Sequence, residues 1–320
     1  MTTVPSSPGP ASTIAPPAVV FHEVSKWFGP VVAVSDVSFT VGQGVTSILG
    51  PNGAGKSTVM RLLCGLTKPS TGSVRVFGRD PRADPGVFSE LGLVPQQETV
   101  IEPLTVNAFV TLTAKLSNVA RPENAARQAI LTVELDPDDG RPIGAYSKGM
   151  RQRVKVAAAI VHQPKLIVLD EPLNGLDPRQ RARMIELFTE LGTNGRSVIV
   201  TSHVLEEIER FGSRIILIAE GRLAAEGEYT QIRALMDDRP LRVRVHCSDA
   251  RAVASHLVRS SALSAVSVDG SALVVDVVEA GTFRKLIART CAELDVDLQE
   301  IIPLDDDLES VFRYLVSRRH

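Results

Sequence analysis

The order of apolar and polar positions along the chain predicts strands that alternate with helices. Largely apolar runs occur at residues 45–49, 166–169, 197–201 and 215–219. Apolar residues at helical spacing follow at 57–65 and at 179–191. Strands without a polar face, separated by helices, indicate an α/β fold with a mostly parallel sheet that is covered on both faces.

A change of pattern near residues 236–240 marks a second, smaller domain. The polar stretch DDRP precedes predicted strands at 241–247, 263–268, 273–278 and 297–302 and predicted helices at 250–258 and 282–294. This β-α-β-β-α-β order is typical of a ferredoxin-like α+β unit. A last helix is predicted at 308–315, where apolar residues recur at helical spacing.

Length and composition fit this division. The chain has 320 residues, 44% of them apolar, which is enough for two domains with a sizeable core. Residues 1–17 are rich in Pro, Ser, Thr and Ala without periodicity, so we expect a disordered tail there. The predicted division is a tail at 1–17, a main domain at 18–235 and a C-terminal domain at 240–320.

Charge, cysteine content and hydropathy exclude several classes. The net charge is −2 with both signs interspersed, which disfavours nucleic-acid binding. Three cysteines lie far apart, which excludes a disulfide scaffold or a cysteine zinc site and suits a reducing cytoplasm. The apolar runs are shorter than the roughly 18 residues of a membrane span, and the N-terminus lacks signal-peptide features. We therefore expect a soluble protein.

Residues 50–58 read GPNGAGKST and match the phosphate-binding pattern G-x-x-x-x-G-K-[ST], between an apolar run and a predicted helix. Glycines let the backbone wrap a phosphate, and the N–H groups and the helix N-terminus then face the anion. Lys56 is expected to bridge the β- and γ-phosphates, and Ser57 to bind Mg²⁺. The predicted nucleotide contacts in this loop are Asn52, Gly53, Gly55, Lys56, Ser57 and Thr58. The pattern identifies a phosphate-binding NTPase.

A second part of the site is predicted at residues 166–171, which read LIVLDE. A carboxylate at the end of a buried parallel strand lies beside the phosphate loop in this architecture. Asp170 is expected to hold Mg²⁺ through water, and Glu171 to polarise the water that attacks the γ-phosphate. Apolar strands that end in Asp are common, so the prediction depends on the glycine loop as well.

Further motifs carry a family resemblance. YSKGMRQR stands at 146–153, PLNGLDP at 172–178 and TSH at 201–203. Over residues 20–230 the chain resembles the ABC transporter ATPase family, because loop, signature, acid strand, D-loop and switch histidine appear in the family's order and at its usual spacing. The resemblance implies a P-loop NTPase nucleotide-binding domain with a helical subdomain.

The resemblance also implies roles for residues outside the phosphate loop. Phe28 matches the aromatic residue that stacks on adenine, with Trp27 as the alternative. Gln96 matches the glutamine that touches Mg²⁺ and links the site to the permease, with Gln97 as the alternative.

Four more residues match contacts of the terminal phosphate or the dimer seam. Ser147 and Gly149 match the signature, which in this family binds the γ-phosphate held by the opposite subunit. Asp177 matches the D-loop acid at the dimer seam, and His203 the residue that contacts the γ-phosphate. A serine at a helix start and a neutral imidazole can both serve such contacts.

The signature departs from the commoner Leu-Ser-Gly-Gly-Gln. Lys148 replaces a glycine and Met150 replaces the glutamine, while the serine and second glycine remain. This variant is similar to that of single-cassette bacterial exporter ATPases. The C-terminal extension also resembles the domain appended in that group, which suggests a regulatory or dimer-contact role.

These observations imply the ATP-hydrolysing subunit of an ABC transporter, with ATP and Mg²⁺ as cofactors. One phosphate loop implies pairing with a second ATPase subunit, most simply a copy of the chain. An integral-membrane permease is the other implied partner, nucleic acid is not, and the direction is export. The implied location is peripheral, at the cytoplasmic face of the membrane.

Two other functions remain open. A ribosome-acting or DNA-repair member of the superfamily would carry two cassettes or a long coiled coil, and neither is present in the sequence. A regulator that binds nucleotide without hydrolysis is disfavoured by the presence of Lys56, Asp170, Glu171 and His203. A phosphate-release assay separates it from an ATPase.

Overall fold

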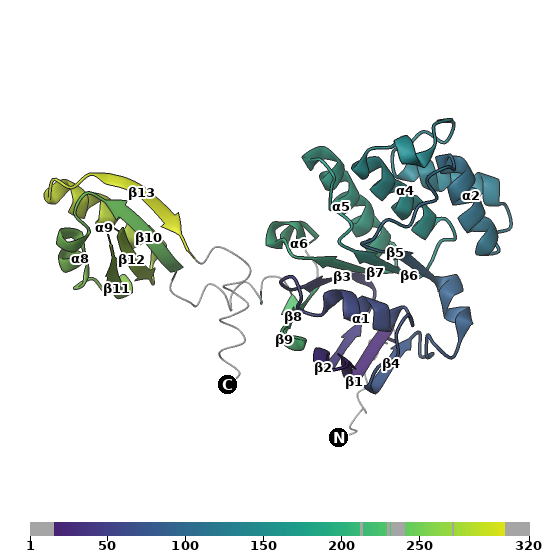
Figure 1. Ribbon diagram of the computed structural model, residues 1–320, viewed down its shortest axis with the longest axis horizontal. Coiled ribbons are helices and arrows are strands. Elements are labelled where there is room, and N and C mark those ends of the chain that lie inside the picture. The colour runs from purple at the N-terminus through teal and green to yellow at the C-terminus, as the bar shows by residue number, and fades with distance from the viewer. Residues whose placement is uncertain (1–15, 212–213, 229–230, 232–240, 271, 305–320) are drawn as a thin grey trace, which may run out of the picture. The chain divides into compact units, whose positions relative to one another are not determined.

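The computed structural model describes residues 16–211, 214–228, 231, 241–270 and 272–304. The chain divides into two compact units, one of Met1–Thr46 with Ser57–Val200 and one of Ser47–Lys56 with Thr201–His320. Figure 1 labels the elements of both units. The helix expected at 308–315 and nearly all of the N-terminal tail lie outside the described residues. The division at 18–235 and 240–320 stays a prediction.

The strands and helices follow one another along the chain in a mixed order. The first elements are β1 (Val19–Phe28), β2 (Val31–Val41), β3 (Gly44–Leu49), α1 (Lys56–Leu63), β4 (Thr71–Val76), the 3-10 helix η1 (Pro85–Glu90), β5 (Leu91–Val94), α2 (Val106–Leu116) and α3 (Pro122–Thr132). Next come the 3-10 helix η2 (Ile143–Ala145), α4 (Lys148–Ile160), β6 (Leu166–Asp170), α5 (Pro178–Thr193), β7 (Ser197–Ser202), α6 (Leu205–Phe211), β8 (Arg214–Ala219) and β9 (Arg222–Glu228).

A six-stranded sheet has the strand order β5-β6-β7-β3-β8-β9. Its β5 and β6 pair in parallel, whereas β8 and β9 pair antiparallel. Every residue of β6 and β7 is buried, which explains why these strands have no polar face in the sequence. The mixed α/β fold with a largely buried sheet confirms the predicted fold class.

A separate antiparallel sheet has the order β2-β1-β4. The buried side chains Val19, Phe21 and Val24 of β1 are interrupted by a register shift, which obscures the strand alternation in the sequence. Phe21 stacks on Phe39 of β2 at 4.4 Å between ring centroids. The sequence pattern alone did not identify this sheet.

Helices α2, α3 and α4 pack on one another, and α4 also contacts β5. Thr105 caps α2 by accepting a hydrogen bond from the backbone N–H of Ala108. Helix α3 begins with Pro122, whose missing N–H costs nothing in a first turn. The helical subdomain implied by the family resemblance is therefore present in the unit that contains Ser57–Val200.

The C-terminal elements are β10 (Leu241–Cys247), α8 (Ala250–Leu257), β11 (Leu263–Asp269), β12 (Ala272–Val277), α9 (Ala280–Glu293) and β13 (Leu298–Pro303). Their sheet has the order β11-β12-β10-β13, and all of its neighbouring strands are antiparallel. This is the strand order of a ferredoxin-like unit, as predicted.

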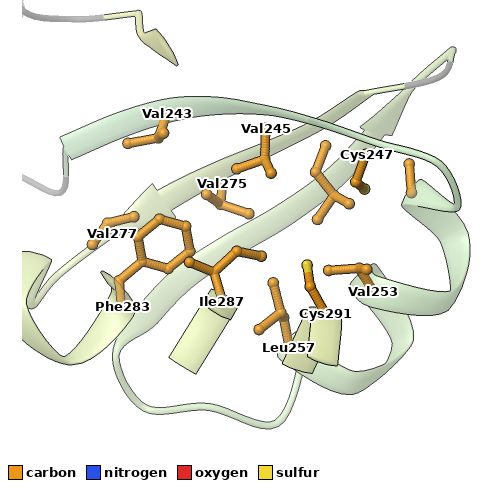
Figure 2. Close-up of a cluster of buried hydrophobic side chains, with 12 residues drawn as sticks. Val243, Val245, Cys247, Val253, Leu257, Val275, Val277, Phe283, Ile287 and Cys291 are labelled. Atoms are coloured by element: carbon orange, nitrogen blue, oxygen red, sulfur yellow. The ribbon is translucent and has the colours of Figure 1, made fainter. Parts of the chain in front are cut away.

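The core of the C-terminal sheet lies between the strands and the two helices. Figure 2 shows Val243 and Val245 of β10 facing Phe283 and Ile287 of α9, and all four side chains are buried. Cys247 and Cys291 belong to the same cluster. Apolar residues at every second position of β10 form this core, while the intervening arginines lie on the other face.

Candidate functional site

The glycine loop follows β3 directly and ends where α1 begins at Lys56. Gly53 and Gly55 have φ values of +81° and +105°, which side-chain-bearing residues rarely adopt. A β-carbon on Gly50 would stand 2.3 Å from the carbonyl oxygen of Ile218 in β8. Backbone conformation at Gly53 and Gly55, and lack of space at Gly50, therefore favour glycine in a loop that leads directly into the N-terminus of a helix.

Lys56 is buried and its ammonium group bonds back to the loop. The Nζ atom donates to the carbonyl oxygen of Gly50 at 2.7 Å and to that of Pro51 at 3.1 Å. These bonds hold the charge beside the loop in which Asn52 and Gly53 are exposed. A nucleotide phosphate would replace carbonyl oxygens by charged oxygens, which bind an ammonium group more strongly.

Two buried carboxyl groups close strand β6. Asp170 is its last residue, at 8% exposure, and Glu171 follows it at 7%. Glu171 has φ +51°, an unusual value for a residue that carries a side chain. Asn174 donates its backbone N–H to the Glu171 carbonyl oxygen at 3.3 Å and its side-chain amide to Oε2 at 3.5 Å. The turn after β6 therefore holds the second carboxylate.

The end of helix α1 lies close enough to Asp170 for the charge of this carboxylate to act on Cys64. Burial, and then the negative charge of Asp170, raise the pKa of Cys64 to about 12. Cys64 follows α1 directly, and Ser57 and Thr58 lie in the first turn of the same helix. A hydroxyl and a carboxylate are hard oxygen donors of the kind that Mg²⁺ prefers, so the residues present fit that ion.

The signature residues lie where helix α4 begins. Ser147 is the N-cap, and its Oγ accepts a hydrogen bond from the backbone N–H of Met150 at 3.2 Å. Its predicted position at a helix start is confirmed. Tyr146 precedes it, and the Arg141 guanidinium carbon lies 5.3 Å from the centroid of the buried Tyr146 ring. Burial, together with a hydrogen bond to Asp139, raises the pKa of Tyr146 to about 12.

The signature packs against the D-loop. A β-carbon on Gly149 would stand 2.7 Å from Gln180 Oε1 and 3.2 Å from the Gly175 carbonyl oxygen. Asp177 caps α5 by accepting the backbone N–H of Gln180 at 2.8 Å. Gly149, Gly175 and Asp177 are thus brought together within one unit, and a side chain at 149 would be crowded by the Gly175 carbonyl oxygen and by Gln180.

The two glutamines after β5 are both exposed, so geometry does not choose between Gln96 and Gln97. Their backbone is held from α4, because Lys155 Nζ donates to the carbonyl oxygens of Pro95 at 3.1 Å and Gln97 at 3.2 Å. Glu98 pairs with Arg151 of the same helix at 3.6 Å.

The candidate adenine contact lies at the end of β1. Phe28 and Trp27 are 47% and 44% exposed, which leaves both rings open to a ligand. The Lys26 ammonium group lies 4.7 Å from the Phe28 ring centroid, over one of its faces. The stacking of adenine on Phe28 stays a prediction.

His203 follows β7 and is partly exposed. The preceding Ser202 donates to Glu207 Oε2 at 2.8 Å and accepts the backbone N–H of Val204 at 3.0 Å. These bonds hold the backbone on both sides of the histidine as α6 begins. His162 Nε2 lies 3.1 Å from the Leu91 carbonyl oxygen, and burial lowers the pKa of His162.

Sequence reasoning missed three residues that contact the motifs. Asn174 lies in the quoted D-loop stretch but received no role, although its contact with Glu171 is local. Lys155 holds the backbone around Gln96, and Arg151 pairs with the side chain of Glu98. No signal in the sequence separates these two from the other basic residues of α4, because their partners lie more than fifty residues away.

Comparisons with known proteins agree on one family. A family model described as ABC transporter matches residues 34–174. The daunorubicin/doxorubicin resistance ATP-binding protein of Streptomyces peucetius is 36% identical over 230 residues, which cover 71% of this chain and 70% of that protein. The Nod factor export ATP-binding protein I of Rhizobium leguminosarum bv. viciae is 34% identical over 228 residues, which cover 68% and 71%.

A solved structure is similar over the same region. It is a dimeric, post-hydrolysis state of an ATP-binding cassette bound to ADP and Pi, with 26% identity, a TM-score of 0.61 and coverage of 66% of this chain and 98% of that one. No helix in the described part of the chain has the length and apolar character to cross a membrane. The chain belongs to the ABC transporter ATP-binding proteins, and it is an ATP-binding and ATP-hydrolysing subunit of such a transporter.

Proposed function

We propose that two copies of the chain close on two ATP molecules and that hydrolysis opens them again to drive export through a separate permease. The observation that carries the chemistry is the buried pair Asp170–Glu171, which ends a strand without any exposed residue. Two adjacent carboxyl groups give one ligand for a metal and one base for water. The similar cassette with bound ADP and Pi is a dimer.

In this proposal each residue has a separate task. Lys56 and the loop N–H groups bind the β- and γ-phosphates, and Thr58 binds the α-phosphate. Ser57, Gln96 and Asp170 hold Mg²⁺, which neutralises phosphate charge when bound. Glu171 takes the proton from the attacking water.

The remaining candidates complete the nucleotide sandwich. Phe28 stacks on adenine, and His203 donates a hydrogen bond to the γ-phosphate. Ser147 and Gly149 of the opposite copy cover that phosphate at the N-terminus of α4, where the helix dipole is positive. Asp177 lies at the seam between the copies.

The permease partner is proposed to contact the face formed by β5, α2 and α4. A cavity of about 280 Å³ lies there, lined by Leu93, Pro95, Phe109, Lys155 and His162 among others. Its lining mixes apolar side chains with the polar side chains of Thr99, Thr113, Ser117, Lys155 and His162, and such a mixed surface suits a short amphipathic helix of a membrane protein. Such a helix would press on the backbone next to Gln96.

Export as the direction is supported by the relatives. One is named for drug resistance and another for Nod factor export. A complex with an exporter permease would place this chain at the cytoplasmic face of the membrane, held by the partner. Co-purification from membranes with a polytopic protein tests the partner, and recovery of the chain without any membrane protein would contradict it.

The hydrolytic mechanism is tested with Glu171→Gln in the full chain. We expect phosphate release to fall at least about 10²-fold because the general base is lost. Equilibrium ATP binding should persist, and ATP should accumulate a dimer in size-exclusion chromatography with light scattering. Glu190→Gln, on the exposed side of α5, is the control. Undiminished hydrolysis by Glu171→Gln would show that another group is the base.

A further inference from the structure

Lys155 is a buried lysine in the helix that begins with the signature. Lys155 carries a charge, yet it is only 4% exposed, and its neighbours along α4, Val154 and Val156, are apolar. Its ammonium group donates to two carbonyl oxygens, those of Pro95 at 3.1 Å and Gln97 at 3.2 Å. Burying a lysine is unfavourable unless such partners are supplied, so the site is built around these two bonds.

The two acceptors flank Gln96 on either side. A single donor thus holds the backbone both before and after the residue that is assigned to Mg²⁺. Hydrogen bonds from a charged donor are stronger than neutral ones, and the low local polarity strengthens them further. Burial lowers the pKa of Lys155, an effect that the charge of Glu98 opposes.

Arg151 adds two contacts one helical turn earlier. Its guanidinium group donates to the Tyr146 carbonyl oxygen at 2.7 Å and lies 3.6 Å from a Glu98 carboxylate oxygen. The Tyr146 carbonyl belongs to the peptide unit that precedes Ser147. Arg151 therefore connects the signature turn to the segment at 95–98, and Lys155 connects the body of the same helix to that segment.

We infer that Lys155 is a positioning residue, which holds the backbone around Gln96 against α4. A movement of α4 would then move this backbone, and a movement of this backbone would move α4. This inference rests on the proposed function of Gln96 and of the signature. Lys155 also lines the cavity assigned to the permease, so a partner helix in that cavity would act on the same bonds.

The variant that tests the inference is Lys155→Met, which keeps an unbranched apolar stem and removes the donor. Lys155→Arg restores a charged donor and serves as the rescue. Lys115→Met is the matched control, because Lys115 is 56% exposed and pairs with Glu123 across the surface of α2 and α3. All variants are made in the full chain.

The first readout is independent of hydrolysis. Hydrogen exchange of the peptide that spans residues 91–98 is measured without nucleotide or metal. We expect faster exchange in Lys155→Met than in the wild type or Lys115→Met, with protection regained in Lys155→Arg. Equal exchange in Lys155→Met and the wild type overturns the inference, whatever the activity does.

The second readout measures the effects on kcat and on KM separately. We expect Lys155→Met to lower kcat about tenfold and to raise the Mg²⁺ concentration at half-maximal rate, since small displacements of positioning groups are costly. The KM for ATP should stay within about twofold, because Lys155 contacts no predicted nucleotide residue. Unchanged kcat and unchanged Mg²⁺ dependence also overturn the inference.

If the Lys155→Met variant does not fold, the Glu98→Gln variant is the test. Glu98 is half exposed, and the substitution removes its pair with Arg151 and the charge that acts on Lys155, so the same directions of change are expected at smaller size. A Glu98→Gln chain identical to the wild type in exchange and Mg²⁺ dependence would then overturn the inference. If the wild type itself hydrolyses no ATP, the proposed function fails, and the exchange experiment still decides the role of Lys155.

Discussion

The aliphatic chain of Lys148 lies over the α-carbon of Gly175. A β-carbon built on Gly175 would stand 2.7 Å from Lys148 Cδ and 2.9 Å from Cγ. The lysine that replaces a glycine of the commoner signature therefore fills the space above the D-loop. Gly175 itself has φ +80°, so both its backbone and its neighbour favour glycine.

A double-mutant cycle separates these two causes. Gly175→Ala should lower the free energy of unfolding by about 1–3 kcal/mol through backbone strain and displacement of Lys148. Lys148→Ala alone should change it by less than about 0.5 kcal/mol, as is usual for an exposed side chain. In the double variant the loss should be smaller than the sum, because no side chain is displaced. Strict additivity in chemical denaturation would contradict the contact.

Lys56→Met is expected to abolish ATP hydrolysis and the rise in melting temperature that ATP causes. The ammonium group is the buried donor to the Gly50 and Pro51 carbonyl oxygens, and a phosphate is its charged replacement. The nucleotide-free chain should also lose about 1–3 kcal/mol of stability, because buried carbonyl oxygens lose their donor. Lys68→Met, on an exposed loop residue, is the control for both measurements.

The three cysteines should be unreactive toward a thiol reagent in the native chain. All three are buried, and burial raises the pKa of Cys247 and Cys291 as well as that of Cys64. A raised pKa leaves the thiol protonated, so the reactive thiolate is scarce at about pH 8. Denaturant should release three equivalents. Rapid reaction of Cys64 in the native chain would contradict its placement after α1.

Glu90→Gln is expected to destabilise the chain at neutral pH but not in acid. A hydrogen bond from Lys165, and then one from Arg79, hold the pKa of Glu90 below its usual range despite partial burial. A lowered folded-state pKa stabilises the chain above the unfolded value near 4.5, and this contribution disappears as the pH falls through the folded value.

The difference between wild type and Glu90→Gln should be about 0.5–1 kcal/mol near neutrality. It should shrink toward zero in denaturant titrations at decreasing pH. Glu123→Gln removes an exposed pair with Lys115 and provides the comparison, since its loss should be hard to detect. A pH-independent difference at Glu90 would show that the ion pair is not its cause.

The spacing of apolar residues predicted the elements that are buried on both faces or that alternate regularly between buried and exposed residues. The apolar runs at 166–169 and 197–201 correspond to β6 and β7, and the strands and helices predicted between 241 and 302 agree with the structure within two residues, whereas the helix predicted at 308–315 lies outside the described residues. The sheet of β1, β2 and β4 was missed, because its register shifts break the two-residue period.

For the candidate site, the sequence predicted the features that depend only on residues close together in the chain. The glycines at 53 and 55 and the cap at Ser147 depend on backbone geometry within a few residues. Lys155 was not predicted, because its burial depends on carbonyl groups from a distant segment. Along helix α4 the structure buries Gln152 and Lys155 together with the aliphatic residues and leaves Ala158 only partly covered. Tertiary neighbours decided that pattern.

The left-handed backbone at Glu171 has a consequence for protein engineering. A residue with a side chain costs about 1–3 kcal/mol in a sparsely populated conformation, whereas glycine costs almost nothing there. Screens that select heat-resistant versions of this chain should therefore enrich glycine or asparagine at position 171. Such variants would not hydrolyse ATP, because the substitution that relieves the backbone strain at 171 also removes the proposed proton acceptor.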